Sequence, residues 1–257
     1  MARAADRTGR PARTSVWLEG RAPRGGTARG GGQPPGLDRE RITAATVRLL
    51  DAEGLARFSM RRLAAELDVT AMSVYWYVDT KDDLLELALD AVSGELELPA
   101  AEPAERWREQ LRALAVGNRA LLVRHPWVSP LIGSFLNIGP HARAFSACVR
   151  EVIGNTGLPP RERTGAMSAV FQFVYGFGTI EGHFVQRCAA AGVSQDEYFR
   201  AAVSRIGEQP QLRDDFAAAA DLMEARGGDT VAEMRDRDFG FALDLLVAGI
   251  EAMVERG

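Results

Sequence analysis

Residues 58–81 read FSMRRLAAELDVTAMSVYWYVDTK and contain two short runs with the apolar period of a helix. Ser59 and Thr70 precede the two runs, and both residue types suit a helix N-cap. The link consists of residues 68–70, in which Asp68 tolerates a left-handed conformation. Two helices joined so tightly pack at a steep angle, and the second can enter the major groove of DNA. The stretch therefore predicts a helix-turn-helix.

The second of these helices leaves an unusual set of side chains for its outer surface. If Val74 and Val78 face the core, five residues are expected to face outward: Ala71, Met72, Ser73, Trp76 and Tyr77. Exposed Met and aromatic side chains suit a nucleic-acid surface, where they contact thymine methyl groups and sugars, and hydroxyls contact phosphates. The alternative is that the aromatic residues pack against the domain itself, with Tyr75 the first candidate for its core.

Basic side chains flank this surface at both helix starts. Arg61 and Arg62 begin the first helix and Lys81 begins the next one, where backbone amides also attract anions. Because the whole chain has a net charge of −4, DNA contact has to come from such a local surface. The candidate DNA-binding residues are Arg61, Arg62, Thr70, Ala71, Met72, Ser73, Tyr75, Trp76, Tyr77 and Lys81.

Two further helices enclose this pair. Asp38 is placed to cap a helix that ends at Gly54, and Thr80 with Asp83 approximates a capping box for a helix running to about Glu97. Residues 37–98 are therefore predicted to form a three-helix DNA-binding domain with a linking helix.

The preceding segment, residues 1–36, has a different composition. It is rich in Gly and Pro and carries seven Arg against Asp6 and Glu19, a net charge of +5. Such a composition predicts disorder. Two interpretations stay open: a basic arm that follows DNA phosphates or enters a minor groove, or a solvated tail. Composition alone favours the tail.

Residues 99–257 show helical apolar periods throughout, and no segment alternates as a strand does. Helices are expected at 103–125, 130–136, 140–154, 161–190, 195–207, 211–226 and from 229 onward. Three glycines fall inside the long helix: Gly176, Gly178 and Gly182. Each lowers the stability of the helix by about 1 kcal/mol relative to Ala. A close helix approach, or a bend beside a cavity, would justify that cost. The fold class is therefore all-α with two domains.

The segment 37–90 resembles the DNA-binding domain of the TetR family of bacterial repressors. Residues 74–81, VYWYVDTK, are similar to the recognition helix of that family and the cap that follows it. The resemblance implies DNA contacts at Arg61, Ala71, Met72, Ser73, Tyr75, Trp76, Tyr77 and Lys81. Tetracycline repressors carry a polar base reader and a Pro where this chain has Ala71 and Met72, and a His where it has Tyr77. These departures imply a different operator sequence.

Weaker resemblance continues in the C-terminal half. Residues 121–127, LLVRHPW, look like the exit of the fifth helix in TetR-type proteins, and residues 238–250 look like their terminal helix. The resemblance implies that the helix at 161–190 and the terminal helix form a four-helix bundle with their copies in a second subunit. Both helices are also too apolar to face water. A symmetric dimer would bury their apolar surfaces. The expected partners are a palindromic duplex operator, a small-molecule effector and a second copy of the chain.

An effector pocket is expected in the second domain. Its candidate lining residues are His125, Trp127, Phe135, Phe145, Phe171, Tyr175 and Glu181. Many aromatic and few polar groups suit a largely apolar, planar ligand, although phenylalanines at helical spacing also fit an ordinary core. Glu181 lies one residue from the acidic position of tetracycline repressors and has no clear His partner. A metal-bound tetracycline, another metal site or a cofactor is therefore not expected.

Other classes of protein find little support. Glu181, His183 and Cys188 form no nucleophile–base pair, so an enzyme is not expected. Cys148 and Cys188 suggest neither a metal site nor a disulfide framework, which suits the reducing cytoplasm. Neither a signal peptide nor a membrane span is expected. The remaining alternative is a constitutive DNA-binding regulator without an effector.

Overall fold

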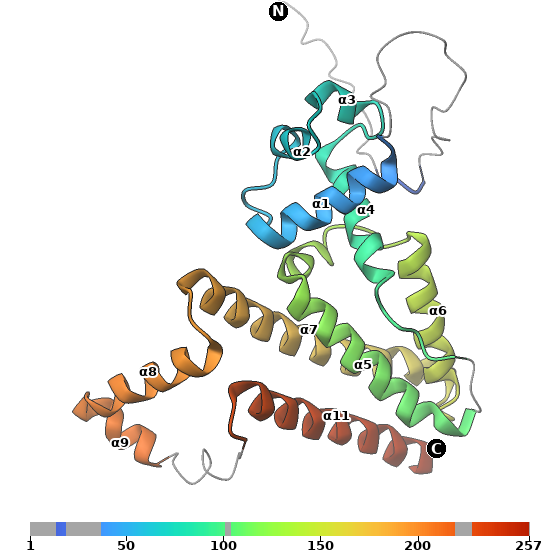
Figure 1. The fold of residues 1–257 in the computed structure, drawn as a ribbon. Coiled ribbons are helices and arrows are strands. Elements are labelled where there is room, and N and C mark those ends of the chain that lie inside the picture. The colour runs from blue at the N-terminus through green and yellow to red at the C-terminus, as the bar shows by residue number, and fades with distance from the viewer. Residues whose placement is uncertain (1–13, 19–36, 101–103, 219–227, 257) are drawn as a thin grey trace, which may run out of the picture. The chain divides into compact units, whose positions relative to one another are not determined.

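The computed structural model describes residues 14–18, 37–100, 104–218 and 228–256. Every regular element in these ranges is a helix, which confirms the all-α prediction (Figure 1). The chain divides into two compact units. The first comprises residues 1–95 and 130–144, and the second comprises residues 96–129 and 145–257.

Four helices form the main part of the first unit: α1 (Arg39–Glu53), α2 (Met60–Glu66), α3 (Ala71–Tyr75) and α4 (Lys81–Ser93). The predicted caps are confirmed, because each cap side chain accepts a hydrogen bond from the backbone amide three residues later. These caps are Asp38, Ser59, Thr70 and Thr80. Thr80 and Asp83 also form the predicted capping box, and α1 ends at Gly54 as predicted.

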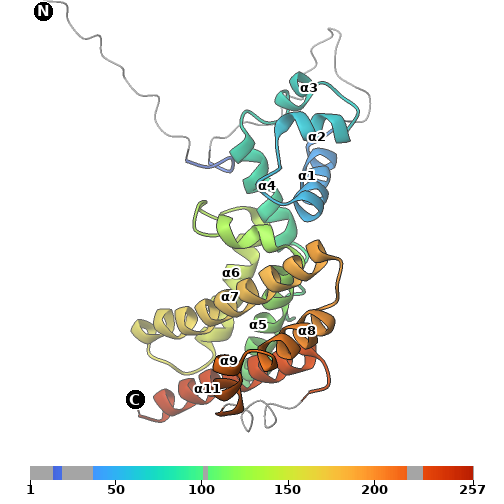
Figure 2. The ribbon, with the colours of Figure 1, turned by 90° about the vertical axis from the view of Figure 1, so that its left-hand side faces the viewer.

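The core of the first unit lies where α1 packs on α4 and α2 packs on α3 (Figure 2). Ile42, Leu63, Val74 and Leu84 are completely buried there. Helix α4 ends at Ser93, whereas the sequence predicted an end near Glu97. Gly94 follows directly, and glycine is among the weakest helix formers, so the helix ends before Pro99 can stop it.

Part of the segment predicted to be disordered is ordered. Residues 14–18 form a turn in which Ser15 is buried against Glu86 of α4. The prediction of disorder is wrong for these five residues, because a buried carboxylate provides hydrogen-bond acceptors that composition does not reveal. The other residues of the 1–36 segment lie outside the described ranges.

The remaining elements are a 3₁₀ turn (η1, Ala104–Arg106), α5 (Trp107–Arg124), a 3₁₀ segment (η2, Pro126–Leu131), α6 (Pro140–Gly154), α7 (Pro160–Ala191), α8 (Gln195–Gly207), α9 (Pro210–Ala218) and α11 (Val231–Arg256). The helix expected at 130–136 is instead η2, which starts earlier. Pro130, which lies inside this segment, lacks the amide hydrogen that a continuing α-helix would need there. Residues 219–226 of the helix expected at 211–226 lie outside the described ranges.

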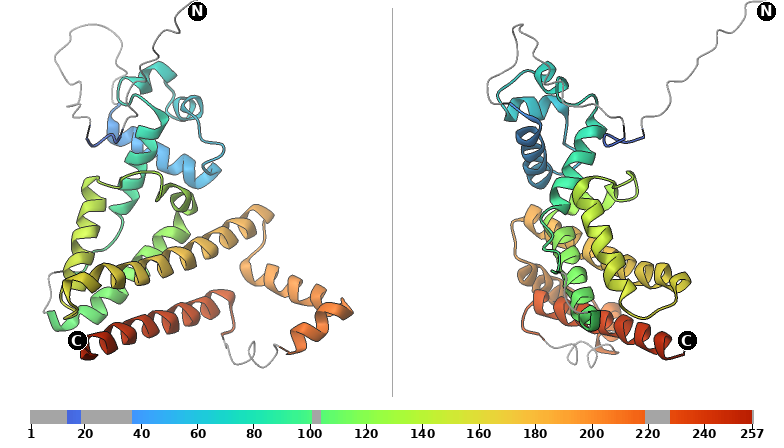
Figure 3. Two further views of the ribbon diagram at one scale, coloured as in Figure 1. Left: turned by 180° about the vertical axis from the view of Figure 1, so that it is seen from behind. Right: turned by 90° about the vertical axis from the view of Figure 1, so that its right-hand side faces the viewer.

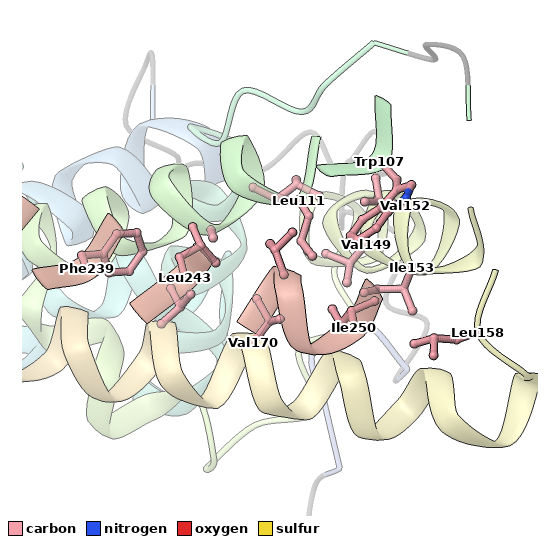
Figure 4. Close-up of a cluster of buried hydrophobic side chains, with 14 residues drawn as sticks. Trp107, Leu111, Val149, Val152, Ile153, Leu158, Val170, Phe239, Leu243 and Ile250 are labelled. Carbon is pink, nitrogen blue, oxygen red and sulfur yellow. The ribbon is translucent and has the colours of Figure 1, made fainter. Parts of the chain in front are cut away.

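Apolar side chains from α5, α6, α7 and α11 form the core of the second unit (Figure 4). Examples of its buried residues, in the order of these helices, are Trp107, Ile153, Val170 and Phe239. Helices α5 and α7 lie side by side, and α11 runs back along them after α8 and α9 (Figure 3). The close contact between α5 and α7 depends on glycines of α7.

The predicted close approach is confirmed at two of the three glycines. A Cβ added to Gly178 would lie 3.0 Å from the Leu122 Cβ, and one added to Gly182 would lie 2.8 Å from the Leu122 carbonyl oxygen. Around Gly176 no described atom comes within 4 Å of an added Cβ. Gly178 and Gly182 therefore permit the α5–α7 contact, whereas Gly176 does not take part in it.

Candidate DNA-binding surface and effector site

The turn between α2 and α3 has the geometry that the sequence predicted. Asp68 has a left-handed backbone with φ of 54°, and the Val69 amide donates to the Ala64 carbonyl at 3.0 Å. Val74 and Val78 are both buried, as predicted, and fix one side of α3 to the domain. The opposite side of α3 is thereby turned outward.

Two large side chains dominate that outward side. Met72 is 69% exposed and Trp76 is 63% exposed. Tyr75, the first candidate for the core, is also exposed, so the alternative of inward packing is wrong for this residue. Ala71 and Tyr77 are half-buried. The exposed apolar surface predicted for a nucleic-acid contact is therefore present, and it is centred on Met72, Tyr75 and Trp76.

The expectation that Ser73 faces outward is wrong. Ser73 is only 8% exposed, and its hydroxyl lies 2.9 Å from that of Thr70. The Ser73 amide also donates to the Thr70 hydroxyl at 3.2 Å. The cap that starts α3 thus draws Ser73 into the turn, because the N-cap and the residue three positions later lie next to each other.

Tyr77 ties the recognition helix to the start of α1. Its hydroxyl donates to the Leu37 carbonyl, and Arg39 donates to the Tyr77 carbonyl at 3.3 Å. These contacts set the position of the C-terminal end of α3 relative to α1. Tyr77 therefore has a bracing role in the domain besides any contact with DNA.

Two of the three predicted phosphate-binding cations make contacts within the domain. Arg62 pairs with Glu53 at 2.6 Å, and this hydrogen-bonded pair raises the pKa of Arg62 and lowers the pKa of Glu53. Lys81 donates to the Phe58 carbonyl at 2.9 Å and lies over the Phe58 ring. Arg61 is exposed on the first turn of α2. Arg61 is thus the best placed of the three to bind an external anion.

The residues predicted to line an effector pocket fall into separate groups. His125 and Trp127 are buried with their rings edge to face at 5.9 Å. Phe145 and Phe171 form a similar pair at 5.6 Å. Phe135 belongs to the first unit, whereas the other six candidates belong to the second. The structure thus shows two aromatic pairs rather than one assembled ring of lining residues.

Glu181 is held by a basic residue that the sequence did not point to. Arg119 of α5 binds both carboxylate oxygens, at 2.6 and 2.9 Å, and also pairs with Asp236 at 2.7 Å. Burial lowers the pKa of Arg119, but its hydrogen bonds and charge interactions with Glu181 and Asp236 outweigh that effect and raise it overall. Tyr175 donates its hydroxyl to the Ser129 carbonyl at 2.9 Å. The polar groups of Tyr175 and Glu181, both proposed to face the ligand, thus have protein partners.

Gln110, a residue that the sequence analysis did not single out, lines a small pocket in the second unit. The pocket is bounded by Pro99, Ala100, Gln110, Cys148, Glu151 and Val152. The buried Oε1 atom of Gln110 has no hydrogen-bond partner in the part of the chain that the structure describes. Burial raises the pKa of the Cys148 thiol, so it stays protonated. The sequence did contain an indication of this residue, because Gln110 interrupts the apolar stripe of α5 between Trp107 and Leu111.

A helix-turn-helix with an exposed apolar recognition face, followed by a larger helical unit, defines a DNA-binding transcriptional regulator. Comparison with known families agrees. Residues 42–88 match the family described as bacterial regulatory proteins, tetR family, and residues 98–254 match the tetracyclin repressor-like C-terminal domain. The chain belongs to the TetR family.

Individual relatives cover most of the chain. An HTH-type transcriptional regulator of Saccharopolyspora erythraea is 36% identical over 85% of this chain and 86% of its own. The HTH-type transcriptional repressor DrrR1 of Streptomyces coeruleorubidus is 34% identical over 93% of this chain and 84% of its own. The crystal structure of the TetR family protein ActR of Streptomyces coelicolor with actinorhodin is 25% identical, with a TM-score of 0.68, and covers 85% of this chain and 97% of that one. Within the described residues, no helix is long and apolar enough to cross a membrane.

Proposed function

We propose that this protein is a ligand-responsive transcriptional repressor, which binds a palindromic operator as a homodimer and is released by a small, largely apolar effector. The observation that carries the DNA-binding part is the exposed Met72–Tyr75–Trp76 surface on a capped, rigidly held α3. Membership of the TetR family and the repressor name of the DrrR1 relative support the regulatory part. Such a repressor would act in the bacterial cytoplasm, where the operator lies.

The DNA-binding residues divide by role. Met72 and Trp76 are proposed to contact base edges and thymine methyl groups in the major groove, with Ala71, Tyr75 and Tyr77 beside them. Arg61 and Thr70 are proposed to bind phosphates at the starts of α2 and α3. Ser73, Arg62 and Lys81 are proposed to hold this surface in shape through their contacts within the domain, and to reach DNA only if those contacts are exchanged.

The effector is proposed to bind in the second unit. The similar protein ActR has been crystallised in complex with actinorhodin. This chain offers two aromatic pairs in its own C-terminal unit, the buried pair His125–Trp127 and the half-buried pair Phe145–Phe171. Gln110 adds a buried polar group without a described partner. Tyr175 and Glu181 are proposed to contribute only if the ligand displaces their present partners. An aromatic lining with few polar groups suits a planar, mostly apolar molecule.

The second subunit is proposed to pack on α7 and α11. Ile180 of α7 and Phe241 and Leu245 of α11 are exposed apolar residues on these two helices. Burying these three side chains would be favourable by about 25 cal/mol for each Å² of apolar surface removed from water. A symmetric pairing of the two helices with their copies would bury them.

The test begins with duplexes selected by the purified protein from random DNA. The Met72→Ala and Trp76→Ala variants are expected to weaken binding to the selected site by about tenfold or more and to relax its sequence preference, since lost base contacts are worth about 1–3 kcal/mol each. Leu136→Ala, another exposed apolar residue of the first unit, is the matched control and should bind normally. Failure of the wild-type protein to select any sequence would overturn the proposed function.

The effector part needs a separate measurement. Planar aromatic compounds that raise the thermal unfolding midpoint should also release the selected duplex, because a ligand that stabilises one conformation shifts the equilibrium by its differential affinity. If the protein selects an operator but no stabilising compound changes DNA binding, the chain is a constitutive regulator instead.

A further inference from the structure

The pocket beside Gln110 lies between the first turn of α5 and the last two turns of α6, and all its lining residues belong to the second unit. Its cavity volume is about 30 Å³. Since roughly 10–15 Å³ suffices for one water-sized group, the pocket has room for the terminal group of a ligand rather than for a whole molecule.

Gln110 is the most buried polar residue of this pocket. It is only 5% exposed, yet its Oε1 atom has no hydrogen-bond partner among the described residues. Trp107 of α5 and Val152 of α6 belong to the apolar core beside it (Figure 4). A buried carbonyl oxygen without a partner is unfavourable, and buried positions normally carry apolar side chains. The oxygen of Gln110 is therefore available to a hydrogen-bond donor that enters the pocket.

The charge of this pocket comes from Glu151. This residue lines the pocket from α6 and is exposed. Cys148 lies three residues earlier on the same face of α6, where burial and the negative charge of Glu151 raise the pKa of its thiol. The thiol therefore stays neutral, and the carboxylate of Glu151 is the charged group of the pocket.

These groups select a ligand by its hydrogen bonding and charge. The Gln110 oxygen and the Glu151 carboxylate are both hydrogen-bond acceptors, so they match a group that carries donors. A primary ammonium group has three N–H donors and a positive charge, whereas a carboxylate or phosphate would be repelled by Glu151. Pro99, Ala100 and Val152 offer apolar contacts to the carbon atoms that bear the ammonium group.

We propose that this pocket binds the primary ammonium group of a small organic ligand, with Gln110 accepting a hydrogen bond and Glu151 supplying the opposite charge. The inference rests on the proposed effector binding in the second unit, and it adds one charged group to an otherwise apolar effector. Phe145 lies three residues before Cys148 on α6 and packs against Phe171. An aromatic body that extends from the pocket along α6 would therefore find a ring to pack on.

The first experiment compares three probes of similar size and different charge: 2-phenylethylamine, 2-phenylethanol and phenylacetate. Each is titrated into the full-length protein at neutral pH, and binding is followed by nuclear magnetic resonance of the Gln110 side-chain amide. The ammonium probe should bind at least about fivefold more tightly than the alcohol, because hydrogen bonds from a charged donor are the stronger ones. Phenylacetate should bind most weakly. Equal affinities for the amine and the alcohol, or tighter binding of phenylacetate, would overturn the proposal.

The second experiment removes each acceptor in turn. Gln110→Leu keeps the size of the side chain and should weaken binding of the amine at least about tenfold, since hydrogen bonds to charged groups are worth more than neutral ones. Glu151→Gln should weaken it by only about two- to fivefold, because an exposed ion pair contributes little. The matched control is Glu208→Gln, at another exposed glutamate of the second unit, and it should bind as the wild type does. Unchanged affinity in Gln110→Leu would refute the site.

Thermal unfolding separates binding from a structural role of Gln110. Without a probe, Gln110→Leu should keep or raise the unfolding midpoint, because it removes a buried oxygen that has no described partner. The amine should raise the midpoint of the wild type but not that of the variant. A lower midpoint for the variant would show that Gln110 stabilises the fold without a ligand, against the proposal.

The outcomes distinguish this inference from the proposed function. If neutral planar compounds release the selected duplex while the amine does not bind at Gln110, the ammonium site is refuted and the repressor proposal stands. If the amine binds through Gln110 but the wild-type protein selects no duplex, the ammonium site stands and the repressor proposal fails.

Discussion

At the scale of single residues, Arg119 joins three helices of the second unit. It donates from α5 to Glu181 on α7 and to Asp236 at the start of α11. Its guanidinium also lies over the rings of Phe177 and Phe239, at 5.1 and 4.7 Å. A planar cation that binds two carboxylates and two aromatic faces fixes the relative positions of all these groups. Arg119 is therefore a structural centre of this unit.

The buried pair of Arg119 and Glu181 should contribute to stability more than an exposed pair of the same unit. Their side chains are 11% and 10% exposed, against 40% and 62% for Arg112 and Asp244. Arg119→Met should lower the free energy of unfolding by about 3 kcal/mol, since it leaves a carboxylate buried without its partner. Arg112→Met should cost less than about 1 kcal/mol. Urea denaturation at a fixed protein concentration measures the free energy of unfolding of both variants. Equal decreases for the two variants would contradict the greater contribution of the buried pair.

At the scale of helices, the glycines of α7 have unequal roles. Gly182 lies against the backbone of α5, whereas Gly165 has no described atom within 4 Å of an added Cβ. Gly182→Ala should therefore separate the two helices and lower the unfolding midpoint. Gly165→Ala should leave it unchanged or raise it, because Ala is favoured over Gly in a helix by about 1 kcal/mol. Thermal unfolding followed by circular dichroism compares them. A similar shift for both would refute the close-packing role of Gly182.

The start of α8 carries an acid-sensitive cap. Ser194 and Glu197 form a capping box, and hydrogen bonds from the Ser194 backbone and side chain hold the pKa of Glu197 below its ordinary value. The stabilisation is thus present above the ordinary pKa of Glu and is lost as the pH falls through the lowered value. Nuclear magnetic resonance should show Glu197 titrating below a reference glutamate. Ser194→Ala removes the hydroxyl but keeps the backbone amide, so it should raise the pKa of Glu197 only part of the way to the ordinary value. A wild-type Glu197 that titrates like the reference glutamate would argue against the cap.

Ion pairs between α5 and α11 also favour one relative direction of these two helices. Arg108 pairs with Glu251, Arg112 with Asp244 and Arg119 with Asp236. As the residue number of the arginine on α5 increases, the residue number of its partner on α11 decreases. The two helices are therefore antiparallel. The charges on facing helix surfaces thereby specify direction, while the apolar core supplies most of the burial.

At the scale of the whole molecule, the exposed apolar residues of α7 and α11 predict association. Phe241→Asp should shift the protein from dimer to monomer and reduce operator affinity, because a charge would then lie in the buried contact. Val203→Asp, on an exposed position of α8, is the control and should remain dimeric. Analytical ultracentrifugation over a range of concentrations measures both. A monomeric wild-type protein, or a dimeric Phe241→Asp variant, would contradict the predicted interface.

The sequence by itself determined the helical class, the four N-terminal caps and the helix-turn-helix, because these depend on contacts between residues three or four positions apart. It also anticipated the outward face at Met72 and Trp76, which follows from the period of α3. Only the tertiary structure decided the roles of Tyr77, Arg119 and Glu86. Each depends on a neighbour that folding brings close, such as Ser15 beside Glu86, and composition carries no record of such a pairing.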